Sequence, residues 1–413
     1  MIIFNRQIRI FILVLLSIFF GLHISYGQIS KNYIYAKVLT KDNTSFEGLV
    51  KFNKRTFLWS DFLKLDKLEN SYSEYIPKNE LVVYNRLADM GDEKDVIINK
   101  DLRYLSEHSL DIRFGFIKAI DFIKRNHVMM EIKDEKFIEL SYNAFYSSFD
   151  MEMIDKEFGK VDIDGSMIER IEFMKTPADM NISRPKPIFG TVKTKQGEFT
   201  GFICWDMDEF LENDLIDGNW EHKEVSIAFK SISSIKRFNE GSIVKTLSGR
   251  DLYLTHSNDV SYGNRGLEVN MPNVGKVKVA WKDFESLTLN HSTDKEGLAY
   301  DDYITAKRLS GTVHLKDSTV CKGVIVYDLD EAMNVENVNG NNSNLNFTIP
   351  FLYVKSIAPK GLKYSKVKLK NGTVLFLGGH RDVNHKNDGV LVFTENGKSR
   401  FFHWFEIENI QFD

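Results

Sequence analysis

The chain has 413 residues, a formal net charge of −4 at pH 7, and 43% hydrophobic and 13% aromatic residues. That share of apolar side chains excludes intrinsic disorder and allows two to four domains of about 100 to 200 residues each. A mildly acidic chain has no electrostatic attraction to nucleic acid or to anionic lipid, so we expect neither as a partner.

Residues 1–27 have the three-part layout of a secretory signal peptide. Arg6 and Arg9 form a basic start, residues 10–22 are an almost unbroken apolar run, and the small residues Ser25 and Gly27 precede the predicted cleavage site. An uncleaved membrane anchor is the alternative, but the run is shorter than the roughly 20 residues that span a bilayer as a helix. We therefore predict an exported protein, periplasmic, at the cell surface or secreted, without a transmembrane segment after cleavage.

The remaining sequence repeats one pattern. Residues 190–209 match residues 311–331 in the order of their glycine, apolar and acidic residues, and residues 36–50 form a fainter copy. Each copy later ends in a triplet of aromatic or aliphatic residues three positions apart, and a second triplet follows it. The triplets begin at Phe114, Gly165, Phe229, Trp281, Phe351 and Trp404. We infer three tandem modules, 33–174, 187–290 and 309–413, each built from two related half-repeats of about 50 residues.

The modules carry the pattern of β-strands. Apolar residues alternate with polar ones, as between Phe199 and Trp205, and a period of two indicates strands. Glycines such as Gly197 and Gly372 between the runs tolerate the positive φ of tight hairpin turns. In strand number the half-repeats resemble small twisted SH3-like or Sm-like β-barrels or sandwiches, a resemblance of pattern only. A membrane-spanning barrel is disfavoured because it needs strands of about 9 to 11 residues.

The first module is longer than the others, with an insertion near residues 53–108. Hydrophobic residues from Trp59 through Phe62 and Leu65 to Leu68 recur at mixed spacing, which fits either a short helix or one more hairpin. A long insertion in a regular scaffold is a candidate functional element, and a plain expansion of the surface is the alternative.

Two acidic loops hold most of the candidate site residues. Each follows a predicted strand and combines one aromatic residue with three carboxylates. Oxygen-rich loops bind Ca²⁺, although this spacing is not that of an EF-hand, and a solvated strand end with an Asp-capped turn is the alternative. The aromatic rings can either stack on a sugar or seal the core. The residues are Trp205, Asp206, Asp208 and Glu209 in one loop, and Tyr327, Asp328, Asp330 and Glu331 in the other.

Two later loops, residues 258–266 and 381–389, are the most similar in the chain. Asp259 and Asp382 stand near their starts and a glycine closes each, so a shaped turn explains them and ligand binding is the alternative. Arg265 has no counterpart in the last copy, which weakens the case for a shared anion site.

His380, Asp382 and His385 look like a metal cluster in the sequence, but one loop offers too few ligands for zinc, and surface histidines are the alternative. No cofactor is predicted, and Ca²⁺ is the metal ion considered. The weak metal candidates are Asp206, Asp208, Asp328, Asp330, His380, Asp382 and His385.

Cys204 and Cys321 occupy positions that are not equivalent in the repeats, so we expect two buried free thiols, and a bridge across modules is the alternative. The sequence contains no nucleophile elbow, phosphate loop or dinucleotide fingerprint, and we name no catalytic residue. Repetition favours a non-catalytic binding or scaffold protein whose partner is a protein or glycan outside the cytoplasm. The alternative is an exported hydrolase of glycans or peptides with its site between modules, which requires carboxylates within about 5 to 10 Å of each other.

Overall fold

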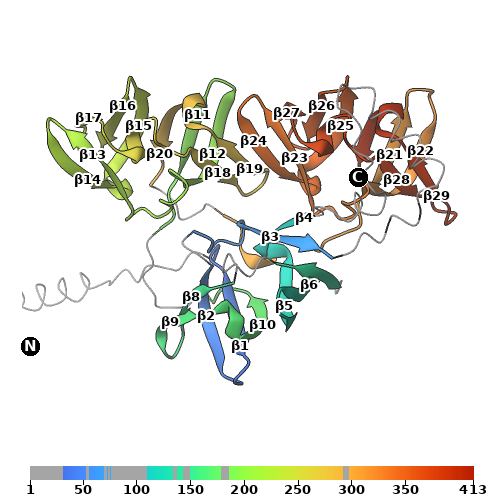
Figure 1. Cartoon of the computed structure of the whole chain (residues 1–413), viewed down its shortest axis with the longest axis horizontal. Helices are drawn as coiled ribbons and strands as arrows, with labels where there is room; N and C mark the ends of the chain where they lie inside the picture. Colours follow the sequence, from blue (N-terminus) through green and yellow to red (C-terminus); the bar gives the residue numbers. More distant parts are fainter. Residues whose placement is uncertain are drawn as a thin grey trace, which may run out of the picture. The chain divides into compact units, whose positions relative to one another are not determined.

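The computed structural model describes residues 31–52, 55–68, 72, 75, 109–133, 137–142, 149–177, 186–291 and 297–413. The predicted signal peptide and most of the predicted insertion lie outside these residues. The all-β prediction is confirmed, because the described residues form antiparallel strands and short 3₁₀ turns (Figure 1). Lys31–Thr176 and Pro185–Asp413 belong to one compact unit.

Within the described residues, no helix has the length and hydrophobicity required to span a membrane.

The first segment, residues 31–177, is a sheet with the order β4-β3-β7-β6-β5-β10-β1-β2-β8-β9. Phe62 and Leu65 of the expected insertion lie in β3, which pairs with β4 as β13 pairs with β14 and β23 with β24. These residues therefore belong to the repeated pattern as a strand, and neither a short helix nor an additional hairpin is observed among the described residues of the expected insertion. The strands are β1 (Tyr35–Thr40), β2 (Ser45–Phe52), β3 (Phe62–Lys67), β4 (Ser109–Arg113), β5 (Ile117–Lys124), β6 (His127–Ile132), β7 (Phe137–Ser141), β8 (Met151–Asp155), β9 (Gly159–Ile163) and β10 (Ile168–Met174).

In the second segment, residues 186–291, the sheet has the order β17-β16-β15-β20-β11-β12-β18-β19, written in the same direction as for the first segment. The hairpin β13-β14 adjoins β17 through a bridge between Asn219 and Thr255. The strands are β11 (Phe189–Thr194), β12 (Gly197–Cys204), β13 (Leu215–Trp220), β14 (Lys223–Ala228), β15 (Ile232–Phe238), β16 (Gly241–Thr246), β17 (Asp251–Leu254), β18 (Leu267–Met271), β19 (Gly275–Val279) and β20 (Phe284–Leu289).

The third segment, residues 297–413, has the order β24-β23-β27-β26-β25-β30-β21-β22-β28-β29. Its strand β24 also pairs with β19, so one continuous sheet runs through the second and third segments. The strands are β21 (Ser310–Leu315), β22 (Val320–Tyr327), β23 (Asn337–Asn342), β24 (Leu345–Pro350), β25 (Val354–Lys360), β26 (Tyr364–Leu369), β27 (Val374–Gly378), β28 (Val390–Phe393), β29 (Ser399–Phe402) and β30 (Ile407–Phe412).

Strand order is therefore the same in all three segments. The first strand of each pairs with the last, and a bulge falls at the same place, after Leu39, Lys193 and His314. The described strands trace open sheets and close no barrel, so the barrel part of the expected fold is not observed.

The hydrophobic triplets have a local cause. Each begins at or beside a 3₁₀ turn, such as Phe229–Ser231 or Trp281–Asp283, that leads directly into a strand. A 3₁₀ turn repeats every three residues, which gives the triplet its spacing. The last members of the two triplets then lie opposite each other on neighbouring strands. These opposed pairs are Ile120 with Ile171, Ile235 with Leu287, and Ile357 with Ile410, and all six side chains are buried.

Contacts between the first segment and the others use buried polar groups. Arg113, which is fully buried, donates a hydrogen bond of 2.9 Å to the carbonyl oxygen of Met271. Asn270 donates one of 3.0 Å to Asp61. The end of β4 and the residue before β3 are fixed to β18 in this way. This arrangement places β3 and β4 near the acidic loop of the third segment.

Cys204 and Cys321 are free and buried, in agreement with the expected free thiols. Burial raises the pKa of the Cys204 thiol to about 12, so this thiol stays protonated and unreactive at neutral pH.

Candidate functional site

The two acidic loops have one backbone conformation. Trp205 bridges to Glu209 and Tyr327 to Glu331, and the first two residues of each turn have positive φ, with Asp206 at 42° and Asp328 at 49°. Two consecutive left-handed residues make a tight turn whose twist matches the flanking strands. The loops are therefore compact strand ends that hold their carboxylates close to the sheet.

The aromatic residues of both loops are buried and offer no ring face to a ligand. Trp205 is 0% exposed, lies 5.2 Å from Phe284 between ring centroids, and donates its indole N–H to the carbonyl oxygen of Asp259. Tyr327 is also 0% exposed and donates its hydroxyl to the carbonyl oxygen of Asp382. Their position agrees with the interpretation that they seal the core.

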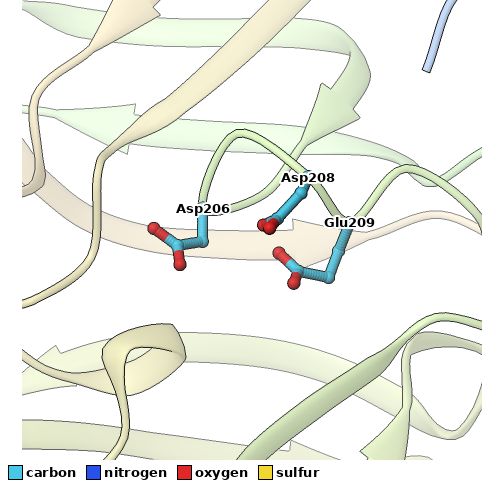
Figure 2. Close-up of side chains that lie close together, drawn as sticks. All are labelled: Asp206, Asp208 and Glu209. Atoms are coloured by element: carbon cyan, nitrogen blue, oxygen red, sulfur yellow. The ribbon is translucent and has the colours of Figure 1, made fainter. Parts of the chain in front are cut away.

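The carboxylates of the second segment converge (Figure 2). One oxygen each of Asp206, Asp208 and Glu209 lies within 4.8 Å of the others, a spacing suited to a cation. Arg265 already supplies positive charge there, because its guanidinium lies 3.2 Å from Asp206 and 2.5 Å from Asp208. Burial, together with the neighbouring Asp208, raises the pKa of Glu209 to about 9, so this carboxyl is neutral at pH 7.

The acidic loop of the third segment is arranged differently. Arg381 takes the place of Arg265, with its Nε 2.9 Å from Asp328, although it stands in a different part of the loop sequence. Asp330 lies 2.8 Å from the ammonium of Lys67, which comes from β3. No sequence pattern indicates either partner, because Arg381 is displaced along the loop and Lys67 belongs to another segment.

The similar later loops are held as shaped turns. Asp259 accepts a hydrogen bond of 2.7 Å from the backbone N–H of Asp217, and Asp382 accepts one of the same length from Asn339. Each aspartate therefore joins a 3₁₀ turn to the strand β13 or β23, which explains its presence without a ligand.

The expected histidine cluster does not assemble. His385 is exposed and lies 2.9 Å from the carbonyl oxygen of Leu362, whereas Nε2 of His380 lies 3.2 Å from the side chain of Asn346. Within the described part of the chain, metal-type ligands converge at Asp206, Asp208 and Glu209, and not at His380, Asp382 and His385.

A cavity of about 380 Å³ opens beside the acidic loop of the third segment. Its walls come from β3 and β4 of the first segment, β19 of the second, and β23, β24 and the loops of the third. The lining is mainly polar and contains both lysine ammonium groups and carboxylates. The polar lining residues are Lys64, Ser109, Asp111, Lys276, Lys278, Asp328, Asp330, Glu331, Glu336, Asn337, Asn339, Asn346, Thr348, His380, Arg381 and Asp382.

The protonation states in this cavity are unusual. Burial raises the pKa of Glu331 well above its ordinary value, and the neighbouring Asp330 adds to the effect. Burial also raises the pKa of Asp111, while Lys276 and Lys64 oppose that shift. The cavity thus combines carboxyl groups that hold their protons more tightly than ordinary acids with the ammonium groups of lysines.

Two acceptors at the cavity have no hydrogen-bond partner among the described residues. They are Oε2 of Glu331 and Oδ1 of Asn337, and the Asn337 side chain is 96% buried while its amide nitrogen donates to the carbonyl oxygen of Asp111. A buried acceptor without a partner costs about 1 to 3 kcal/mol, so water or a ligand hydroxyl is expected there.

The sequence patterns identify Asp328, Asp330, Glu331, His380 and Asp382 as candidates but miss the rest of this site. Lys64 and Lys276 lie in strands of other segments and follow no motif. No signal in the sequence identifies them, because only folding brings the three segments to one cavity.

Comparison with protein-family models, with curated proteins and with solved structures finds no match to this chain.

Proposed function

We propose that this chain is an exported, non-catalytic binding protein of three tandem β-modules that takes the hydroxyl-rich end of a glycan into the polar cavity. The observation that carries it is the convergence of polar side chains from three segments on that cavity. A structural junction of this size would be sealed by apolar side chains, because unpaired polar groups reduce stability.

The mixture of donors and acceptors suits saccharide hydroxyls. Each hydroxyl both donates and accepts, and the walls offer ammonium and carboxyl donors beside amide and carboxylate acceptors. Lys278 is one of the ammonium donors and Asn339 one of the amide groups of the lining. The ion pair of Lys278 with Glu268 is 3.9 Å long and partly exposed, so a ligand can replace it at little cost. The free acceptors on Glu331 and Asn337 are satisfied when ligand hydroxyls enter.

The experiment is glycan-array binding followed by calorimetry on the chain and its variants. Glu331→Gln and Lys278→Met should each weaken binding by about tenfold, the effect of one lost hydrogen bond. Glu209→Gln and Lys245→Met are the matched controls, because Glu209 occupies the equivalent loop position without lining the cavity. Absence of any saccharide binding, or equal losses in test and control variants, would contradict the proposal.

Hydrolysis is the second candidate function. Glu331, whose pKa burial raises, shares the cavity with Asp328 and Asp382, and general acid–base cleavage uses two carboxyl groups, one that donates a proton and one that accepts it. Turnover of a bound saccharide or peptide that disappears in Glu331→Gln, while binding persists, would select the hydrolase over the binding protein.

Export rests on the sequence of residues 1–27. N-terminal sequencing of the protein recovered from outside the cytoplasm should begin at Gln28, and a product that still begins at Met1 would contradict cleavage.

A further inference from the structure

One strand pair joins the second segment to the third. In it, Val277 lies opposite Phe347 and Val279 lies opposite Leu345, and all four side chains are at most 2% exposed. Gly275 begins β19 where a side chain would meet the carbonyl oxygen of Thr348. A strand that receives β24 as β19 does therefore needs a glycine at its start, followed by apolar residues at every second position.

Strand β9 of the first segment is the counterpart of β19. The pairing registers align Gly159 with Gly275 and Ile163 with Val279, since each pair lies at the same place opposite β8 or β18. The two sequences share one pattern, Phe-Gly-Lys-Val-Asp-Ile at residues 158–163 and Val-Gly-Lys-Val-Lys-Val at residues 274–279.

No described strand occupies the edge of β9 that faces away from β8. Among the described residues β9 pairs with β8 alone, and a Cβ at Gly159 would have nothing within 4 Å. Phe158 is 66% exposed, whereas its counterpart Val274 packs against the hydrophobic core. An open edge with an apolar pattern is a template for strand addition.

The third segment's counterpart of this edge, β29, lacks the pattern. Its register places Lys398 where β19 has Gly275 and Arg400 where β19 has Val277. Basic side chains at those positions oppose strand addition, because they would have to be buried at the junction.

The strand that fits β9 is a counterpart of β24 with an open edge. Strand β14 meets that description, since among the described residues it pairs with β13 alone, and its register puts Val225 and Ile227 where β24 has Phe347 and Ile349. Lys223 takes the place of Leu345 at the first residue of β14, where its side chain is exposed and its ammonium can extend past the strand end into solvent. Copying the β19–β24 register onto β9 and β14 sets Val161 opposite Val225 and Lys160 opposite Ser226.

We propose that the β9 edge of one chain receives β14 from a second copy of the same chain. The contact repeats the β19–β24 junction between molecules and uses two different surfaces, so it is heterologous and builds a ring or an open chain. Its occupant is a second copy because the receiving pattern and the fitting strand both occur in this chain, in an arrangement the chain already uses internally.

Analytical ultracentrifugation of the full chain over a concentration series tests this. The wild type should self-associate. Val161→Arg, which copies Arg400 of β29, should raise the dissociation constant at least about tenfold. Asp162→Lys, which copies Lys278 and would face Glu224, should lower the dissociation constant. Val320→Arg is the control, because Val320 is 55% exposed but lies in β22, a strand with neighbours on both sides. A monomeric wild type, or a Val161→Arg variant that associates as the wild type does, would overturn the proposal.

Cross-linking tests the register. A chain with Ser226→Cys mixed with a chain with Lys160→Cys should form an inter-chain disulfide, because copied pairing sets these positions opposite each other. Ser226→Cys mixed with Ser399→Cys places the second thiol on β29 and should form none. Equal yields from the two mixtures would show that association does not use β9.

Discussion

The ammonium of Lys67 lies 2.8 Å from a carboxylate oxygen of Asp330 and joins the first segment to the acidic loop of the third. The same ammonium lies 2.5 Å from Glu336, which accepts two backbone hydrogen bonds in that loop. All three side chains are at most 13% exposed. Burial alone would lower the pKa of Lys67, but Glu336 and Asp330 together raise it above its usual range, so the lysine is charged. The ammonium of Lys67 thus holds two lining residues of the cavity, Asp330 and Glu336, in place.

Lys67→Met should destabilise the protein by about 3 to 5 kcal/mol, because it leaves two buried carboxylates without their cation. Urea unfolding measures the loss. Lys156→Met is the control, since Lys156 pairs with Glu47 at an exposed site and such pairs contribute about 0 to 1 kcal/mol. Equal losses in the two variants would show that the Lys67 pair is as weak as a surface pair.

Stability should depend on pH through Asp61. Burial raises its pKa to about 6 from an unfolded value near 3.8, against the opposing hydrogen bonds from Leu58 and Phe57. The folded state then holds the proton more tightly, so the contribution is fully present below pH 3.8 and is lost as pH rises through 6. The loss amounts to about 3 kcal/mol at most.

Asp61→Asn should remove that pH dependence between pH 4 and 6. The substituted amide keeps an acceptor for the two backbone N–H groups. It replaces the oxygen that accepts the N–H of Asn270, so the Asn270 amide must turn over to bring its Oδ1, which has no partner among the described residues, to the new NH₂. Chemical unfolding at a series of pH values measures the slope. An unchanged slope in the variant would assign the effect to other acids.

Glu209 gives a second pH effect in a different window. Its pKa of about 9 lies above the unfolded value of 4.5, so its contribution is complete below pH 4.5 and is lost as pH rises through 9. Glu209→Gln should therefore be more stable than the wild type at pH 9 and differ little at pH 4.5. Thermal melts at these two pH values measure the difference, and an equal difference at both would contradict the raised pKa.

Gly323→Ala should destabilise the chain by more than about 3 kcal/mol. Gly323 lies in β22, and a Cβ there would run into the carbonyl oxygen of Phe393 on β28, so the strands would have to separate. Gly249→Ala is the matched control, because a Cβ at Gly249 has nothing within 4 Å and only its φ of 88° opposes alanine, at about 1 kcal/mol. Unfolding free energies that fall equally would contradict the close approach.

The all-β class and the hairpin turns could be predicted from the amino-acid sequence, because both depend on short-range chemistry. A period of two marks strands and glycines mark hairpins within a few residues along the chain, whereas the 3₁₀ turns at the triplets beginning at Phe229 and Trp281 were found only in the structure. The folded chain alone shows that Lys64, Lys276 and Glu331 share one cavity, that Arg381 replaces Arg265, and that, among the described strands, β19 is joined while β9 is open. These relationships depend on contacts between segments far apart in sequence, and no local pattern encodes which strand edges meet.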